Sequence, residues 1–296
     1  MTNWRFLKDK IARRGMIALA FTSLLLVIGM GGGLFAKSLP ILQEHSLSNL
    51  LFSSSWHPMK GEFGFFPFIM GTIWVTLLAI VLAFPISILV AVFLTGFSQK
   101  RIWKLVYPIL DILASLPSVI YGVWGTLLIV PWISRFFGPI FVEYTSGYTV
   151  LAGGIVLAVM ILPVLISLMT ELFKTVPEEL RDVSISLGAT TWQTAKFVIL
   201  RKTKAGIFAI VALAISRALG ETIAVLMVCG NSAETPHSIF NACYPLSALI
   251  ANNYGEMLSV PLYESALMLA AFLLFIIVLI FNLSSQLVLR YIKTNE

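Results

Sequence analysis

The stretch GIFAIVALAISRALGETIAVLMVCG, residues 206–230, contains only two charged side chains, Arg217 and Glu221. Its length and apolar character predict a membrane-spanning helix, because about 20 apolar residues cross the hydrocarbon core of a bilayer. Residues four apart share one face of a helix, so both charges are expected on the same side at mid-membrane. A charge at that depth costs ~2.5–3.5 kcal/mol and usually faces a bundle interior or a water-filled path. We therefore expect the functional site in this stretch.

The rest of the chain has the composition of a membrane protein. Of its 296 residues, 58% are hydrophobic and 11% are charged, and the mean hydropathy is +0.94. A soluble domain has about 25% charged residues. The sequence therefore predicts an all-α membrane protein with six transmembrane helices. Their expected positions are 16–36, 69–95, 108–133, 149–173, 206–230 and 265–289.

The first of these segments could also be a signal peptide, because five basic residues precede it. However, its apolar run is too long for the hydrophobic region of a signal peptide, and no A-x-A cleavage site closes it. We therefore expect it to be retained as the first transmembrane helix.

The distribution of lysine and arginine predicts the orientation, since cytoplasmic loops carry an excess of both. The N-terminus, the loop at 98–107, the segment at 174–205 and the C-terminal tail together hold sixteen of them. The loops on the other side hold only Lys37, Lys60 and Arg135. Both termini are thus expected in the cytoplasm. The net charge of +6 reflects this topology and does not indicate nucleic-acid binding, because no basic stripe is interleaved with aromatic residues.

The inner segment predicts two short amphipathic helices joined at Gly188, which we call the elbow (residues 177–201). Pro177 followed by two glutamates is a helix-start signal, since carboxylates favour the positive end of the helix dipole. Thr190 and Gln193 match a capping box at the start of the second helix. Apolar residues follow on one face of each helix. They are Leu180, Val183 and Leu187 in the first helix, and Trp192, Ala195 and Ile199 in the second.

The elbow resembles the EAA loop of ABC importer permeases, whose pattern is Glu-Ala-Ala, three residues, Gly, nine residues, Ile-x-Leu-Pro. Here Asp182-Val183-Ser184 is followed by Gly188 and then by Val198-Ile199-Leu200, and Arg201 stands at the usual proline position. The segments LPSVIYGVWG (116–125) and SRALGETIAVLMVCGN (216–231) resemble phosphate-specific permeases. The outer-loop segment at 50–58 and the start of the second span resemble the PstC type in particular.

This resemblance implies a type I ABC importer permease with a MetI-like fold and cytoplasmic coupling helices. The implied domains are residues 1–66 (N-terminal segment, first helix and outer loop), a permease domain at 67–290, and a tail at 291–296. The implied partners are a second permease subunit of the PstA type, two ATP-binding subunits that hold ATP and Mg²⁺, and an external phosphate-binding protein. The ATPase-coupling residues would be Asp182, Val183, Ser184, Gly188, Ala189 and Leu200.

The expected function is transport of inorganic phosphate across the bacterial cytoplasmic membrane by alternating access. The chain is not expected to be an enzyme, because it has no G-x-x-x-x-G-K-[ST] loop for ATP. Arg217, Glu221 and Thr222 are the candidate pathway residues. Arg217 and Glu221 either form an internal salt bridge or flank an anion path, in which Glu221 would accept a proton-bearing oxygen of phosphate.

Several alternatives stay open from the sequence. The anion could be sulfate, molybdate or tungstate, and the chain could instead be an enzyme acting on a lipid phosphate or a sensory subunit. Asp111 could be interfacial or line the path. Cys229 and Cys243 could form a disulfide, although two unpaired thiols are the favoured interpretation, and the three histidines predict no metal site.

Overall fold

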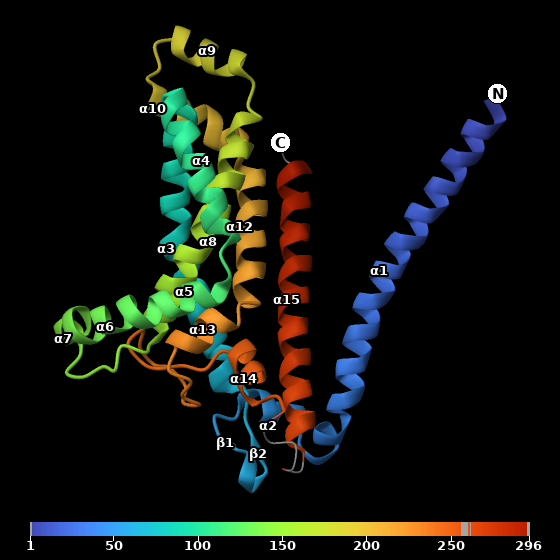
Figure 1. The fold of residues 1–296 in the computed structure, drawn as a ribbon, viewed down its shortest axis with the longest axis vertical. Helices are drawn as coiled ribbons and strands as arrows, with labels where there is room; N and C mark the ends of the chain where they lie inside the picture. Colours follow the sequence, from blue (N-terminus) through green and yellow to red (C-terminus); the bar gives the residue numbers. More distant parts are fainter. Residues whose placement is uncertain (1, 256–259, 261, 295–296) are drawn as a thin grey trace.

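The computed structural model describes residues 2–255, 260 and 262–294, and it confirms an all-α architecture (Figure 1). The long helices are α1 (Thr2–Glu44), α3 (Phe66–Gly96), α4 (Lys100–Ser115), α8 (Val150–Lys174), α12 (Lys204–Leu219) and α15 (Tyr263–Thr294). The short helices are α2 (Leu47–Phe52), α5 (Ser118–Trp124), α6 (Val130–Trp132), α7 (Gly138–Phe141), α9 (Glu178–Ser186), α10 (Thr191–Thr194), α11 (Leu200–Lys202), α13 (Ile223–Val228) and α14 (Leu246–Asn253). Strands β1 (Trp56–His57) and β2 (Glu62–Phe63) form one antiparallel hairpin.

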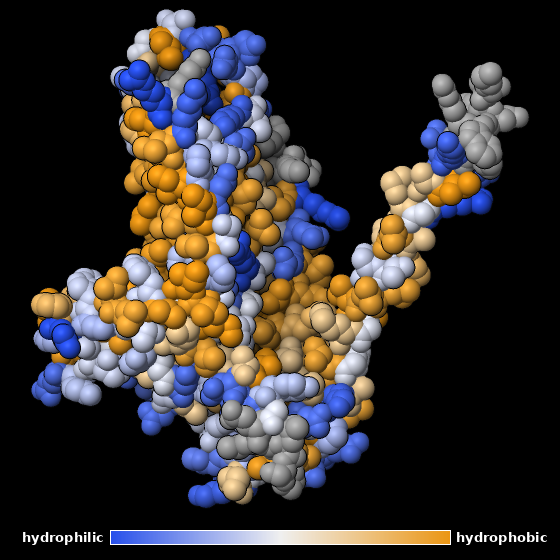
Figure 2. All heavy atoms as spheres, viewed as in Figure 1, coloured by the Kyte–Doolittle hydropathy of each residue, from blue (hydrophilic) through white to orange (hydrophobic). Residues whose placement is uncertain are grey.

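Five helical segments in the described part of the chain are long and apolar enough to cross a membrane. They are Lys8–Glu44, Phe66–Gly96, Ser118–Phe141, Val150–Lys174 and Tyr263–Tyr291. Figure 2 shows an apolar band around the middle of the molecule, with polar residues gathered at the elbow end and at the hairpin end. Lipid tails favour such a band, since they cannot hydrogen-bond to polar groups. The chain is therefore a multi-pass membrane protein.

The core is built around α3 and α8, which form the most extensive helix pair of the fold. Small residues allow this close approach, because a β-carbon on Gly154 would stand 2.6 Å from the Leu78 side chain. Helices α4 and α12 also pack against α8. Pro85 and Pro163 lie inside α3 and α8, and both helices continue through them.

The remaining long helices stand at the side of this core. Helix α15 packs along α12 and α14, and α1 packs mainly on α15 before it leans away from the bundle (Figure 1). Most large apolar residues of α1 before Gly31 are exposed, whereas a β-carbon on Gly31 would stand 3.0 Å from the Phe275 ring. Helix α1 therefore presents a long apolar surface that this chain does not cover.

The predicted fifth span at 206–230 is wrong as a continuous helix. Helix α12 ends at Leu219, three residues intervene, and α13 begins at Ile223. The break forms because the Gly220 N–H donates to the Arg217 carbonyl at 3.2 Å and the Glu221 N–H donates to the Ala218 carbonyl at 3.2 Å. These bonds close the last turn tightly, as is common at helix ends. The described part of the chain therefore does not contain the six continuous membrane-spanning helices that the sequence predicted.

The predicted third span at 108–133 is also interrupted. Helix α4 ends at Ser115, and α5 starts after Pro117. A proline has no N–H to continue the helix, and it disfavours helical geometry in the residue before it. Leu116 is accordingly extended, with φ −63° and ψ 135°. The segment from α5 to α7 then leaves the bundle at a steep angle (Figure 1).

The elbow and both ends of the chain lie at the same end of the molecule, and the β1–β2 hairpin lies at the opposite end (Figure 1). This arrangement agrees with the distribution of basic residues. The first helix is longer than the expected 16–36. The last two residues of the tail expected at 291–296 lie outside the described residues.

Candidate translocation site and elbow

Arg217 lies in the last turn of α12 and its side chain is exposed. It is 13 residues beyond Lys204, or about 20 Å along the helix at 1.5 Å per residue. Because the hydrocarbon core of a bilayer is about 30 Å thick, this places Arg217 deep within the membrane. A cation at that depth requires a partner surface or a water-lined path in place of lipid. The surroundings of Arg217 are therefore the candidate site.

Glu221 and Thr222 lie in the break between α12 and α13, and both are half-buried. Arg217 and Glu221 do not share a helical face as the sequence predicted, because the helix ends between them. They also form no ion pair within 4.0 Å of each other. The break is held in place by Ser247, whose hydroxyl donates to the Glu221 carbonyl at 2.7 Å, and the Thr222 hydroxyl donates to the Gly220 carbonyl at 3.2 Å. Arg217 and Glu221 therefore do not neutralise each other in this structure.

Tyr121 of α5 lies close enough to Arg217 for an electrostatic interaction. Its hydroxyl donates to the Leu113 carbonyl of α4 at 2.6 Å. This bond joins the end of α4 to α5, the helix whose Tyr121 interacts with Arg217. Sequence reasoning singled out the segment that carries Tyr121 but gave this tyrosine no role.

The two segments that resemble phosphate permeases pack directly on each other. Helix α5 carries Gly122, where a β-carbon would stand 3.3 Å from the Ala224 Cα of α13. At Gly125 a β-carbon would stand 2.5 Å from Val156 of α8 and 2.9 Å from Val228 of α13. The glycines of LPSVIYGVWG therefore allow α5, α8 and α13 to approach closely beside the break.

Gly230 and Asn231 end this region with a left-handed turn, at φ 86° and 51°. Asn231 donates its side-chain amide to the Leu226 carbonyl at 3.0 Å. Cys229 and Cys243 are both buried free thiols, as the favoured interpretation expected, and the Cys243 N–H donates to the Cys229 carbonyl at 2.9 Å. In this structure the pair 230–231 stops a helix and contacts no pathway charge.

Sequence reasoning missed a polar contact between α12 and α15. The Ser216 hydroxyl is shared between the Ala212 carbonyl of its own helix at 2.9 Å and the Asn282 Oδ1 at 3.0 Å, and the Asn282 amide donates to the Val278 carbonyl at 2.8 Å. Ser216 precedes Arg217, so this bond fixes the turn that carries the arginine. Asn282 follows the uninterrupted apolar run of residues 266–281 in the sixth predicted span, and it was the available sequence signal. Asp111, for comparison, is exposed on α4.

The elbow has the two-helix form that the sequence predicted. Gly188 sits between α9 and α10 at φ 86°, a conformation that residues with a β-carbon rarely adopt. The capping box is present, with the Thr190 hydroxyl accepting from the Gln193 N–H at 3.2 Å and the Gln193 side chain accepting from the Thr190 N–H at 2.8 Å. The local signals of this segment are thus confirmed.

The predicted coupling residues divide into two groups. Asp182, Val183 and Gly188 are exposed, and Leu187 beside them is 84% exposed. Ser184 instead shares a hydrogen bond of 2.9 Å with Thr194. Two others are half-buried, Ala189 at the turn and Leu200 against the main core. The exposed apolar residues of α9 form a surface that another protein could cover.

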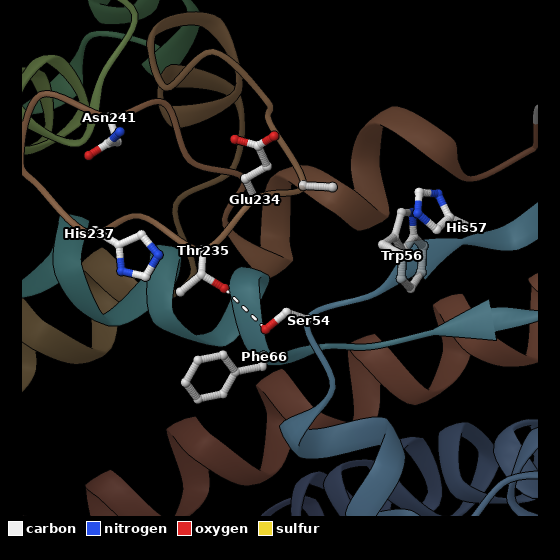
Figure 3. Close-up of a pocket in the computed structure, with 9 residues that line it drawn as sticks. Ser54, Trp56, His57, Phe66, Glu234, Thr235, His237 and Asn241 are labelled. Atoms are coloured by element: carbon white, nitrogen blue, oxygen red, sulfur yellow. Dashed lines mark hydrogen bonds between the residues drawn. The ribbon is translucent and has the colours of Figure 1, made fainter.

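The opposite end of the molecule holds a polar pocket of about 570 Å³ between the β1 strand and the loop after α13 (Figure 3). The Thr235 hydroxyl donates to the Ser54 hydroxyl at 3.4 Å and links the two walls. His57 and His237 lie at different ends of the pocket. Among the described residues, no three His, Cys, Asp or Glu side chains are grouped so that they could hold a metal ion.

A helical bundle with a broken helix at membrane depth and an exposed two-helix elbow defines the membrane component of a transport system. Residues 83–294 match the family described as binding-protein-dependent transport system inner membrane component, and the chain belongs to this family. The fold is also similar to the MetNI methionine ABC transporter in inward-facing conformations, with a TM-score of 0.55 and 19% identity over 75% of this chain and 90% of that chain.

Curated relatives are similar over most of their length. A phosphate transport system permease protein PstC from Mesorhizobium japonicum is 34% identical over 285 residues, covering 92% of this chain and 86% of the relative. A probable phosphate transport system permease protein PstC from Methanocaldococcus jannaschii is 32% identical, covering 93% and 90%. The PstC protein of Xylella fastidiosa strain 9a5c is 32% identical, covering 84% and 80%.

Proposed function

We propose that this chain is a permease subunit of an ATP-driven importer that carries inorganic phosphate across the cytoplasmic membrane by alternating access. The names of the relatives supply the substrate class. The observation that carries the proposal is the exposed Arg217 at membrane depth, beside a helix break and unpaired with Glu221. A permanent ion pair would have neutralised the arginine, whereas this arrangement leaves it available to an anion.

The chemistry of Arg217 suits phosphate. A guanidinium presents a planar fork of donors that matches tetrahedral oxyanions, and it stays charged at any physiological pH. A single arginine gives a transient site that can admit the anion and release it. Glu221 would discriminate by accepting a hydrogen bond from the protonated oxygen of hydrogen phosphate, which sulfate lacks. Thr222 would contribute its hydroxyl at the same break.

The uncovered surfaces suit the partners of such an importer. A second related permease subunit would cover the exposed arginine and the apolar face of α1, since lipid would penalise the charge. Two ATP-binding subunits, which hold the ATP and Mg²⁺, would dock on the elbows of the two paired permease subunits. An external phosphate-binding protein would deliver the anion at the end that holds the hairpin and the polar pocket. This orientation leaves both termini in the cytoplasm.

The test is phosphate uptake into proteoliposomes that contain the complete complex. The phosphate-binding protein is added to the buffer outside the vesicles. Arg217→Ala should reduce uptake to background while the complex still assembles, and Arg135→Ala, at an exposed arginine near α7, should retain it. Retained uptake in Arg217→Ala would refute the assigned role. Competition by sulfate, molybdate and tungstate tests the alternative anions, because an anion that competes equally well would displace phosphate as the proposed substrate.

A further inference from the structure

Arg181 connects the elbow to the core of the membrane domain. Helix α9 has no buried residue, and most of its surface is open. Arg181 is its exception, since the guanidinium turns inward and donates from Nη2 to the Phe173 carbonyl at 2.6 Å and from Nη1 to the Thr95 carbonyl at 3.2 Å. In the described part of the chain, no other side chain of α9 hydrogen-bonds to α3 or α8.

The two acceptors are the ends of different helices. Thr95 lies in the last turn of α3 and Phe173 in the last turn of α8. Carbonyls in a last turn lack the usual partner four residues on in their own helix, and the helix dipole makes that end negative. The Phe173 carbonyl also accepts a longer bond from the Val176 N–H at 3.4 Å. Both the carbonyl acceptors and the negative end of the dipole therefore favour a guanidinium at this position. Its planar fork can reach two acceptors in different directions, which the compact ammonium of a lysine does less well.

The burial of Arg181 makes the loss of these two hydrogen bonds more costly in free energy. Its Nε is buried and has no hydrogen-bond partner, so the guanidinium is partly desolvated. Losing a hydrogen bond to a buried charged group is more costly than losing one at the surface. The Ser184 contact, by comparison, joins α9 only to α10 within the elbow.

Helices α3 and α8 lead from this point to the candidate site. They form the most extensive pair of the fold, and Val156 of α8 contacts the close packing at Gly125 between α5 and α13. Helix α13 begins where the break with Glu221 and Thr222 ends. A displacement of α9 that is transmitted to the ends of α3 and α8 would therefore reach the elements around Arg217.

We propose that Arg181 is a positioning residue that transmits movement of the elbow to the α3–α8 pair, and so couples ATP hydrolysis on the partner subunits to transport. This inference rests on the proposed function. It requires the two hydrogen bonds themselves and not only the packing of the arginine stem. It also predicts that loss of these bonds separates hydrolysis from transport and does not weaken both together.

The experiment compares Arg181→Met, Arg181→Lys and Arg135→Met in the complete reconstituted complex. Methionine keeps an apolar stem but removes every donor. Lysine keeps the charge near the helix ends, which preserves assembly, but cannot reproduce the fork. Arg135, just before α7, is an exposed arginine outside the elbow, so it is the matched control. ATP hydrolysis and phosphate uptake are measured on the same preparations.

We expect Arg181→Met to hydrolyse ATP near the wild-type rate while the ATP used per phosphate rises about tenfold or more. One lost hydrogen bond to a charged group corresponds to about tenfold, and this variant loses two. Arg181→Lys should give an intermediate ratio, and Arg135→Met should leave the ratio unchanged. The inference would be overturned if Arg181→Lys and Arg181→Met used as much ATP per phosphate transported as the wild type. An equal fall of ATP hydrolysis and phosphate uptake would overturn it as well. If Arg181→Met does not assemble, the ratio in Arg181→Lys alone decides. Absence of phosphate uptake in the wild type would instead contradict the proposed function.

Discussion

Gly122 and Met227 are in direct contact where α5 meets α13, since a β-carbon added to Gly122 would stand 2.6 Å from the Met227 sulfur. The contact joins the two sequence segments that resemble phosphate permeases, which are about a hundred residues apart in the chain and meet beside the helix break. The occurrence of both segments in one chain therefore has a structural basis, because the glycine of one segment leaves space for the side chains of the other.

Replacing Gly122 with leucine should prevent this approach. The Met227 side chain can move aside for a methyl group, but the Ala224 Cα at 3.3 Å belongs to the backbone and cannot. Overpacking of this kind costs about 1–3 kcal/mol or more. We expect loss of folded complex on heating, measured by size-exclusion chromatography, together with loss of uptake. Gly15→Leu is the control because no atom lies within 4 Å of its added β-carbon, and equal stability of the two variants would contradict the prediction.

The Ser216–Asn282 bond should stabilise the turn of α12 that carries Arg217. Interhelical hydrogen bonds in membrane proteins contribute about 0.6 kcal/mol on average and at most about 1.7 kcal/mol. We expect Ser216→Ala, Asn282→Ala and the double variant to show coupling of that size in a thermal-unfolding double-mutant cycle. Additive effects of the two substitutions would mean that this bond contributes nothing to stability.

The sequence predicted the features whose causes are local. Pro177, Gly188 and the pair Thr190 and Gln193 act on their immediate neighbours, so the form of the elbow could be derived from them. The fold class followed from composition and from the resemblance, and the comparisons confirm it.

The break at residues 220–222 was not predicted, because a single glycine in an apolar run is a weak signal for a helix end. What stabilises the break comes from elsewhere in the chain, namely Ser247 of α14 and the packing of α5 on α13. Arg181 was missed for the same reason, since its contact with Thr95 spans 86 positions of sequence. Such contacts depend on tertiary structure and leave no periodicity to detect.

Glu221→Gln tests whether the free carboxylate contributes to anion selectivity. A glutamine side chain has nearly the same shape and can donate a hydrogen bond, so it removes the requirement that the ligand supply the proton. When a ligand leaves a buried polar group of its site without a hydrogen bond, the site can discriminate against that ligand by more than about tenfold. We expect the preference for phosphate over sulfate to fall by about tenfold or more, measured as competition of sulfate against phosphate uptake. An unchanged preference would remove Glu221 from the selectivity mechanism.

Leu187→Glu should separate partner docking from folding. Leu187 is 84% exposed at the end of α9, and a substitution at such a position usually changes stability by less than about 0.5 kcal/mol. An ATP-binding subunit that covers this surface would have to desolvate the new carboxylate, so we expect the purified chain to retain its folding and lose its ATPase partner. Met59 is 82% exposed near the hairpin at the opposite end, and Met59→Glu introduces the same charge there. Co-purification of the ATPase subunits with each variant is the measurement. Retention of the ATPase by Leu187→Glu, or its equal loss from Met59→Glu, would exclude this face of the elbow as the docking surface.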